Sequence, residues 1–185
     1  MRVLILFFVF LAFAACTSDK QDGLRPISLE GICSQRPDYH PCNFKLKDQN
    51  DKEVSLYSFY GEITVLDISA MWCGPCVMAA GDVQEIADKY GINYLTLLIE
   101  DTQGNEPDLE DVQAWSENNK INEPVLQGSP DMISSWPDAG WPLYALPTFY
   151  FMDEELVIQV VQSGYNKSVI ESYIETIRGQ KIYMQ

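Results

Sequence analysis

The residues best suited to chemistry are two cysteines in the run Trp72-Cys73-Gly74-Pro75-Cys76. A thiol attacks a disulfide only as the thiolate, so a redox cysteine needs a setting that stabilises the anion and a second sulfur that resolves the mixed disulfide. Cys73 would lie at the start of a helix, where unpaired backbone N–H groups favour an anion, and Cys76 one turn further on the same face. Pro75 is tolerated in a first helical turn, and Gly74 lets another chain approach closely. The pair therefore predicts thiol-disulfide exchange.

The elements that would position this pair can be predicted from the pattern around it. A compact apolar run at 64–68 predicts a buried strand just before the pair. Four apolar residues between 83 and 90 recur at i, i+3, i+4 and i+7, which predicts one face of a helix that Gly91 ends. A second buried run follows at 94–99. The order strand, helix, strand predicts a parallel, right-handed βαβ unit.

Further elements are predicted on both sides of that unit. Alternating residues at 44–46 and 54–56 around a turn-rich centre predict a β-hairpin. Asp108 can cap a helix that carries Leu109, Val112 and Trp115, and a loop rich in Pro, Gly and Trp runs from 127 to 142. Runs at 148–152 and 156–161 predict a second hairpin, and residues 168–171 predict a capping box that opens a final helix through Ile177.

The sequence around the cysteine pair resembles thioredoxin, and more closely the exported, membrane-tethered TlpA/ResA-like branch of that superfamily. The run 72–76 matches the thioredoxin active site throughout, and the resemblance covers about residues 44–177. It implies an α/β, thioredoxin-like fold with a central mixed β-sheet flanked by helices, an N-terminal β-hairpin and an inserted helix near 109–115. The implied activity is that of a protein disulfide oxidoreductase.

The same resemblance implies roles for residues outside the pair. Asp67, six residues before Cys73, matches the buried aspartate that serves the resolving cysteine. Pro147 matches the cis-proline that lies against the disulfide, and Leu146 and Thr148 beside it match the segment that pairs with a substrate backbone. The rest of the substrate-binding surface would consist of Trp72, Gly74 and Pro75.

One departure from thioredoxin concerns the surroundings of Asp67. The predicted strand 94–99 has no lysine, where thioredoxin places one near its aspartate. Asp67 would then be desolvated without a cationic partner, which should raise its pKa. A raised pKa suits a general base that takes the proton from Cys76. The alternative is a strand carboxylate that simply bonds to a nearby backbone or hydroxyl group.

Other functions for the cysteine pair are less well supported by the sequence. A zinc site would need Cys33, His40 and Cys42 to supply further ligands, and the Gly-Pro filling between strand and helix favours redox chemistry over zinc. A peroxidase of the peroxiredoxin kind would need a cysteine in a Pro-x-x-x-Thr-x-x-Cys setting, which this sequence lacks. A non-catalytic binding or metal-delivery module is the alternative function, although copper-carrying relatives space their cysteines more widely and add a later histidine.

The first residues predict export to a membrane. The apolar run 3–15 is shorter than the roughly 20 residues that span a bilayer, and it is typical of a signal peptide. The small residues just before Cys16 resemble a bacterial lipoprotein signal, although Phe13 departs from the usual Leu. We expect a signal peptide over 1–15, lipidation of Cys16 within a flexible tether over 16–26, and one thioredoxin-like domain over 27–185. Simple secretion and an uncleaved anchor stay open.

The remaining cysteines support an exported protein, and the net charge limits its partners. With Cys16 lipidated and Cys73 paired with Cys76, Cys33 and Cys42 are left to form a structural disulfide, the alternatives being a second redox pair or metal ligands. A formal net charge of −15 disfavours nucleic acid as a partner, because phosphates repel an acidic surface.

We therefore expect an extracytoplasmic, membrane-anchored reductant, on the periplasmic side or at an outer membrane, that needs no cofactor or metal. Its partners would be disulfide-containing client proteins and, as the resemblance implies, a membrane protein that supplies electrons.

Overall fold

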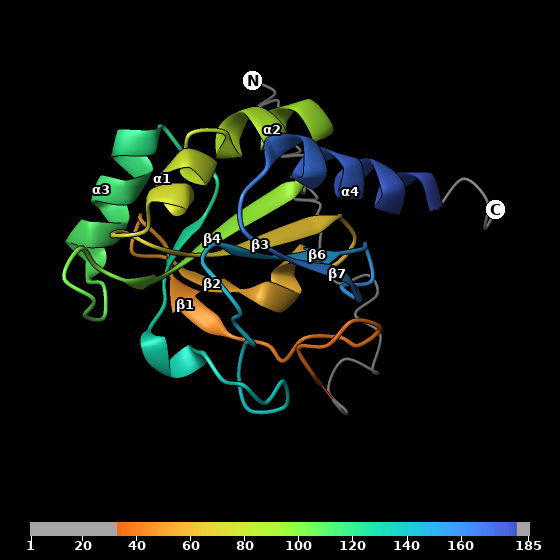
Figure 1. Cartoon of the computed structure of the whole chain (residues 1–185), viewed down its shortest axis with the longest axis horizontal. Helices are drawn as coiled ribbons and strands as arrows, with labels where there is room; N and C mark the ends of the chain where they lie inside the picture. The colour runs from red at the N-terminus through yellow and green to blue at the C-terminus, as the bar shows by residue number, and fades with distance from the viewer. Residues whose placement is uncertain (1–32, 181–185) are drawn as a thin grey trace, which may run out of the picture.

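The centre of the molecule is a five-stranded mixed sheet (Figure 1). The protein is described here from a computed structural model, which covers residues 33–180. The strand order is β5-β4-β3-β6-β7, with β3, β4 and β5 parallel and β6 and β7 antiparallel to their neighbours. The strands are β3 (Thr64–Ala70), β4 (Asn93–Glu100), β5 (Val125–Gln127), β6 (Thr148–Met152) and β7 (Ile158–Ser163).

Helices cover one face of the sheet, and a hairpin with irregular segments covers the other (Figure 1). All seven residues of β3 are buried, including the polar Asp67 and Ser69, because this central strand is covered on both faces. The covering elements are helices α1 (Gly74–Ala80), α2 (Val83–Tyr90), α3 (Leu109–Asn119) and α4 (Lys167–Gln180) on one face, and the β1 (Lys45–Lys47) and β2 (Glu53–Ser55) hairpin with the 3-10 turns η2 (Leu56–Phe59) and η3 (Pro130–Met132) on the other.

The predicted fold class is confirmed, together with most of the elements around the cysteine pair. The sheet is mixed and central, the β1–β2 hairpin is antiparallel, and β3, α1, α2 and β4 form the expected parallel unit. Gly91 ends α2 in the left-handed conformation at φ 54°. Asp108 caps α3 through a reciprocal capping box with Asp111, so the predicted inserted helix begins where the sequence placed its cap.

Three local features differ from the predictions. The predicted capping box over 168–171 is wrong: Ser168 lies inside α4, and the Asn166 side chain accepts a hydrogen bond from the Val169 N–H instead. The segment after Cys73 is two helices, because the chain turns at Gly81 and Asp82 between α1 and α2. Strand β5 was not predicted; its three residues hydrogen-bond to β4 just before the loop.

The predicted signal peptide, the lipidation site at Cys16 and the tether over 16–26 lie outside the described residues. Within residues 33–180, no helix is both long enough and apolar enough to cross a bilayer.

Candidate active site

Cys73 and Cys76 form a disulfide at the start of α1, directly after β3. Cys73 is the N-cap residue of α1, and its Sγ accepts a hydrogen bond from the Cys76 backbone N–H at 3.2 Å. Pro75 lies in the first helical turn, as predicted, where its missing N–H leaves no helical bond unmade. Both cysteines are buried, with Cys73 4% exposed and Cys76 fully covered. The bond is therefore reachable only from the Cys73 side.

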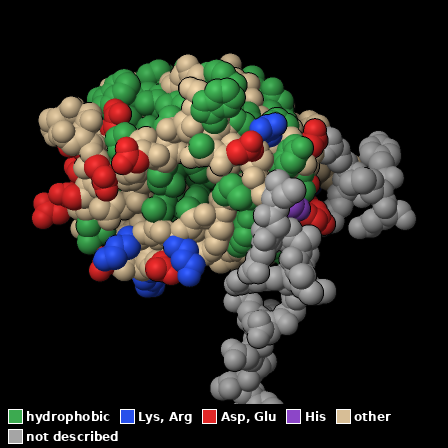
Figure 2. All heavy atoms as spheres, turned by 90° about the horizontal axis from the view of Figure 1, so that it is seen from below, with side chains coloured by type: hydrophobic (Ala, Val, Ile, Leu, Met, Phe, Trp, Pro, Cys, Tyr) green, Lys and Arg blue, Asp and Glu red, His purple; other side chains and the backbone are tan. Residues whose placement is uncertain are grey.

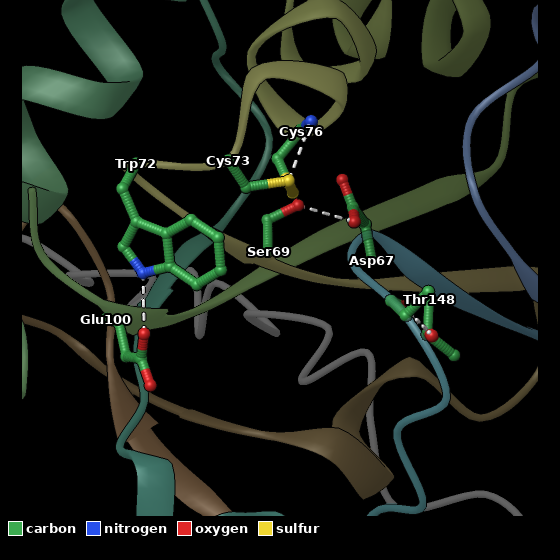
Figure 3. Close-up of a disulfide and its surroundings, with 8 residues drawn as sticks. Asp67, Ser69, Trp72, Cys73, Cys76, Glu100 and Thr148 are labelled. Carbon is green, nitrogen blue, oxygen red and sulfur yellow. Dashed lines mark hydrogen bonds between the residues drawn. A yellow bond between two sulfur atoms is a disulfide. The ribbon is translucent and has the colours of Figure 1, made fainter. Parts of the chain in front are cut away.

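A cleft of about 460 Å³ opens beside Cys73. Its lining is mostly apolar, and it is formed by three segments that are distant in sequence, 72–75, 99–100 and 143–146. Trp72 at its rim is 54% exposed, and the indole N–H donates to Glu100 Oε2 at 2.6 Å (Figure 3). The predicted substrate-binding residues Trp72, Gly74, Pro75 and Leu146 all line this cleft.

The loop before β6 forms the opposite wall of the cleft. The Leu146–Pro147 peptide bond is cis, as the resemblance implied. Thr148 does not line the cleft: it is fully buried, its hydroxyl donates to the Ala145 carbonyl at 2.6 Å, and it also lies 3.1 Å from the Ser163 hydroxyl. The Thr148 side chain therefore fixes the loop, and the pairing of this segment with a substrate backbone stays a prediction.

Asp67 lies on β3 among the residues around the disulfide (Figure 3). It is 1% exposed, and its Oδ1 accepts a hydrogen bond from the Ser69 hydroxyl at 2.7 Å. Its Oδ2 has no hydrogen-bond partner in the part of the chain that the structure describes. Burial raises the pKa of Asp67 from 3.8 to about 7, against the opposing effect of the Ser69 hydrogen bond. A carboxyl group in this state can take up and release a proton near neutral pH.

Cys33 and Cys42 form a second disulfide, which belongs to a separate part of the molecule. Its loop bonds to β7 through the Asp38 N–H and through the Tyr39 carbonyl, and neither of its cysteines lines the cleft beside Cys73. Among residues 33–180, no group of three or more His, Cys, Asp or Glu side chains is arranged to hold a metal ion.

Comparison with known proteins places this geometry in a family. The model of the AhpC/TSA family matches residues 39–161, about two thirds of the chain. The chain belongs to the AhpC/TSA family. Together with the thioredoxin-like and thiol-disulfide relatives below, this match confirms the predicted enzyme class, a disulfide oxidoreductase of thioredoxin-like fold.

Individual relatives of this AhpC/TSA protein are similar over most of its length. The thioredoxin-like protein YneN of Bacillus subtilis is 24% identical over 122 residues, which is 66% of this chain and 68% of that relative. A secreted thiol-disulfide isomerase from Corynebacterium glutamicum superposes with a TM-score of 0.61 at 18% identity, over 76% of this chain and 86% of that structure. The exposed lipoprotein thioredoxin Etrx1 of Streptococcus pneumoniae superposes with a TM-score of 0.57 at 24% identity, over 73% of this chain and 99% of that structure.

Two residues of the site were missed by the sequence analysis. Ser69 is the only hydrogen-bond partner of the Asp67 carboxylate within the described residues, and Glu100 holds the Trp72 indole. The i+2 spacing of Ser69 from Asp67 on one strand was a usable signal, since alternate residues of a strand share a face. Glu100 could not be found in this way, because its contact with Trp72 depends on the pairing of β3 with β4.

Proposed function

We propose that this protein reduces disulfide bonds of client proteins outside the cytoplasm through Cys73 and Cys76. The observation that carries the proposal is a cysteine pair whose first sulfur caps a helix at the edge of an apolar cleft, while the second is fully buried beneath it. The cleft can receive an extended client segment, and only Cys73 lies at its surface.

The first step is attack by Cys73. In the reduced protein, the Cys73 thiolate attacks one sulfur of a client disulfide, a bond forms between Cys73 and that sulfur, and the other client sulfur leaves as a thiolate. The Cys76 N–H, which already points at Cys73 Sγ, stabilises the anion before attack. Leu146 and the exposed rim residue Trp72 would hold the client segment on either side.

Cys76 completes the exchange. Its thiol gives a proton to Asp67, its sulfur bonds to Cys73, and the bond between Cys73 and the client breaks, releasing a second client thiolate that takes a proton from solvent. The client gains two electrons and the protein ends as the Cys73–Cys76 disulfide. Asp67 suits this task because burial raises its pKa to about 7, so the proton can be held and later released.

The predicted anchor gives the place of action. The apolar run before Cys16 supports export and lipidation, and the similar Etrx1 protein is itself named an exposed lipoprotein thioredoxin. A lipid on Cys16 would tether the domain to the membrane, where a membrane protein could return two electrons to the disulfide after each cycle. The Gly-Pro pair between the cysteines, as in thioredoxin, favours reduction over oxidation of clients.

An insulin-reduction assay with dithiothreitol tests the chemistry, and a redox titration tests its direction. Cys73→Ser should abolish turnover, while a reduction potential close to that of thioredoxin, about −270 mV, would support a reductant. A potential near −120 mV, the value of a strong oxidant, would contradict the proposed direction. Cys76→Ser expressed in the natural host should trap clients on Cys73, and mass spectrometry would identify them together with their compartment.

A further inference from the structure

Within residues 33–180, three buried oxygens without a hydrogen-bond partner lie on β3 and β4, and β3 leads directly into the redox pair. They are Asp67 Oδ2, the Tyr94 hydroxyl and Thr96 Oγ1. Tyr94 and Thr96 are completely buried, and Asp67 is 1% exposed. A buried polar group left without a partner costs about 1–3 kcal/mol, so native proteins satisfy such groups, often with an ordered water molecule.

The three oxygens share one face of the sheet. Asp67 and Thr96 are direct partners in the parallel pairing of β3 with β4, so their side chains leave the sheet on the same side. Tyr94 stands two residues before Thr96 on β4 and therefore on that side as well. It packs in the core cluster that also contains Cys76. Within the described residues no direct hydrogen bond joins the three oxygens, so one bridging group with several hydrogen bonds would satisfy them together.

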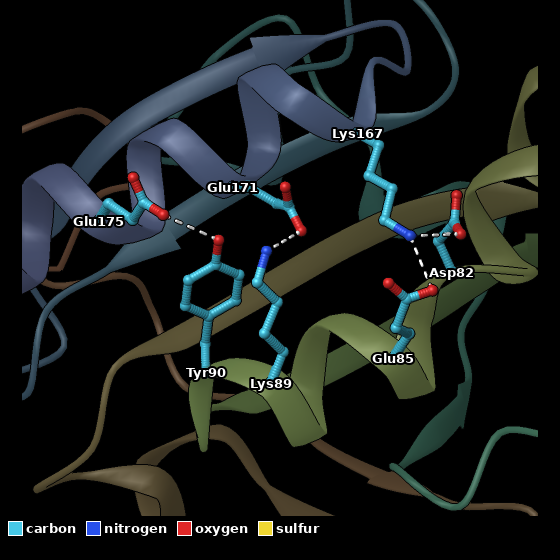
Figure 4. Close-up of polar contacts among 7 residues, drawn as sticks. All are labelled: Asp82, Glu85, Lys89, Tyr90, Lys167, Glu171 and Glu175. Atoms are coloured by element: carbon cyan, nitrogen blue, oxygen red, sulfur yellow. Dashed lines mark hydrogen bonds and ion pairs between the residues drawn. The ribbon is translucent and has the colours of Figure 1, made fainter.

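Other ionisable groups approach the same place from the loop before α4 and from the α1–α2 junction. Tyr165 donates a hydrogen bond to Asp82. Figure 4 shows the Lys167 Nζ between Asp82 and Glu85, at 2.9 Å and 2.8 Å from their carboxylates. Burial raises the pKa of Tyr94, and the charges of Asp67, Tyr165 and Asp82 raise it further, so Tyr94 stays protonated and can donate. Burial alone would raise the pKa of Asp82, but the hydrogen bonds from Tyr165 and Lys167 outweigh this effect, and the pKa of Asp82 is lowered.

We propose that Tyr94 and Thr96 bind one internal water molecule against Asp67 and act as positioning residues for the proton that Asp67 takes from Cys76. The inference rests on the proposed function, because it concerns the resolving step. Each hydroxyl can donate to the water, and the water can donate to Asp67 Oδ2, which gives it three polar partners, the number typical of a buried water. The water is thus a neutral hydrogen-bond donor to Asp67, at a place where thioredoxin has a lysine and strand β4 has none.

The proposed site acts on one proton transfer. Cys76 loses its proton to Asp67 as its sulfur attacks Cys73, and the Cys73–client bond breaks. After the client has left with its electrons, Asp67 returns its proton to the water, which lies on the side of Tyr94. Tyr165 and Asp82 are hydrogen-bonded to each other and close enough to Tyr94 to affect its pKa, and Asp82 is partly exposed to solvent. The hydrogen bond from the water favours the ionised carboxylate, so it determines the pH at which Asp67 can accept the proton.

The resolving step can be followed directly with an aromatic disulfide that releases a coloured thiol. Mixing it with reduced protein gives one release when Cys73 attacks and a second when Cys76 resolves the mixed disulfide. We expect Tyr94→Phe and Thr96→Val each to raise the pH midpoint of the second phase by about one pH unit, because the carboxylate loses a donor to its charged form. Below the midpoint the second phase should slow about tenfold, since only the ionised fraction accepts the proton.

Tyr90→Phe is the matched control, because Tyr90 belongs to the same core cluster but its hydroxyl bonds to Glu175 on the α4 side (Figure 4). Its second phase should keep the wild-type midpoint. In an Asp67→Asn background, Tyr94→Phe should add no further change in the pH profile.

Unchanged midpoints in Tyr94→Phe and Thr96→Val, with thermal stability raised by loss of a buried unpaired hydroxyl, would overturn the inference and leave the proposed function intact. An equal shift in Tyr90→Phe would also overturn it, because the effect would then be general to the core. Failure of the proposed function looks different: both thiol releases would persist in Cys73→Ser.

Discussion

The two disulfides of the described chain have opposite settings. Cys33–Cys42 closes a loop that is fixed on its outer side by backbone bonds to β7 and by the bond from the Gln35 N–H to the Pro137 carbonyl. Cys73–Cys76 is buried at a helix start, faces a cleft on one side and has a carboxyl group with a raised pKa nearby. The Cys33–Cys42 disulfide therefore stabilises a loop that backbone hydrogen bonds hold in place. The Cys73–Cys76 disulfide is suited to exchange, because a client and a proton acceptor can both approach it.

Deleting the nucleophile should separate the two disulfides most clearly. Cys73→Ser should lower the insulin-reduction rate by about 10³-fold or more, because it removes the attacking sulfur. The double variant Cys33→Ser/Cys42→Ser should keep the rate within about threefold, since its site does not touch the cleft. An equally large loss of insulin-reduction rate in the double variant would show that both disulfides take part in exchange, and would contradict the difference drawn between them.

Asp67 should make the redox region a source of instability at high pH. In the folded, oxidised protein burial raises the pKa of Asp67 to about 7, whereas in the unfolded chain it lies near 4, so the folded state holds more protons between these values and stability falls as pH rises through that range. Asp67→Asn removes this loss. It should raise the free energy of unfolding at pH 8 by roughly 4 kcal/mol, with little change at pH 4.

Urea denaturation of the oxidised proteins at the two pH values measures this difference. Ser69→Ala is a useful companion, because it removes the hydroxyl that donates to Asp67 and should leave a pH-dependent loss of similar or larger size. A gain from Asp67→Asn that is equal at pH 4 and pH 8 would mean that Asp67 is not a proton-holding group.

The closing disulfide should contribute stability and little else. Its loop, with a sequence separation of 9, is worth about 2–3 kcal/mol by the chain-entropy estimate. Cys33→Ser/Cys42→Ser should lower the unfolding free energy by that amount, independently of pH between 4 and 8. A pH-dependent loss of unfolding free energy would indicate that the Cys33–Cys42 disulfide is coupled to ionisable groups. It would then resemble the Cys73–Cys76 disulfide in this respect.

The smallest effect is expected at the rim of the cleft. Glu100→Gln weakens the charge-assisted bond to the Trp72 indole and should raise the KM for insulin about threefold with kcat unchanged, because only client binding is affected. Trp72→Phe should act in the same direction through loss of the N–H and of ring surface. In a Trp72→Phe background, Glu100→Gln should have no further effect; a further effect would show that Glu100 contacts the client itself.

Much of the redox region could be predicted from the sequence because its signals are local. The run 72–76, the apolar strand before it and the position of Asp67 all lie within residues 64–76, and the structure places them together. Helix α3 could be predicted in the same way, because Asp108 caps it by accepting a hydrogen bond from an N–H group of that helix.

The features that escaped prediction depend on distant partners. Glu100 reaches Trp72, and Thr96 stands opposite Asp67, only because β3 and β4 pair in one register. Strand β5 has three residues and owes its form to β4, while Asn166 rather than Ser168 caps α4 although both residue types are good caps. Competing local signals of equal strength are decided by packing, which a single sequence does not contain.

Cys73 has two duties in the fold, since the sulfur that exchanges electrons also caps α1 by accepting the Cys76 N–H. A thiolate is a stronger acceptor than a disulfide sulfur, so opening the bond should tighten the first helical turn while it frees the second cysteine. Amide hydrogen exchange at Cys76 would then be slower in the reduced protein than in the oxidised one. The stability of the first turn of α1 would thus depend on the redox state of the protein.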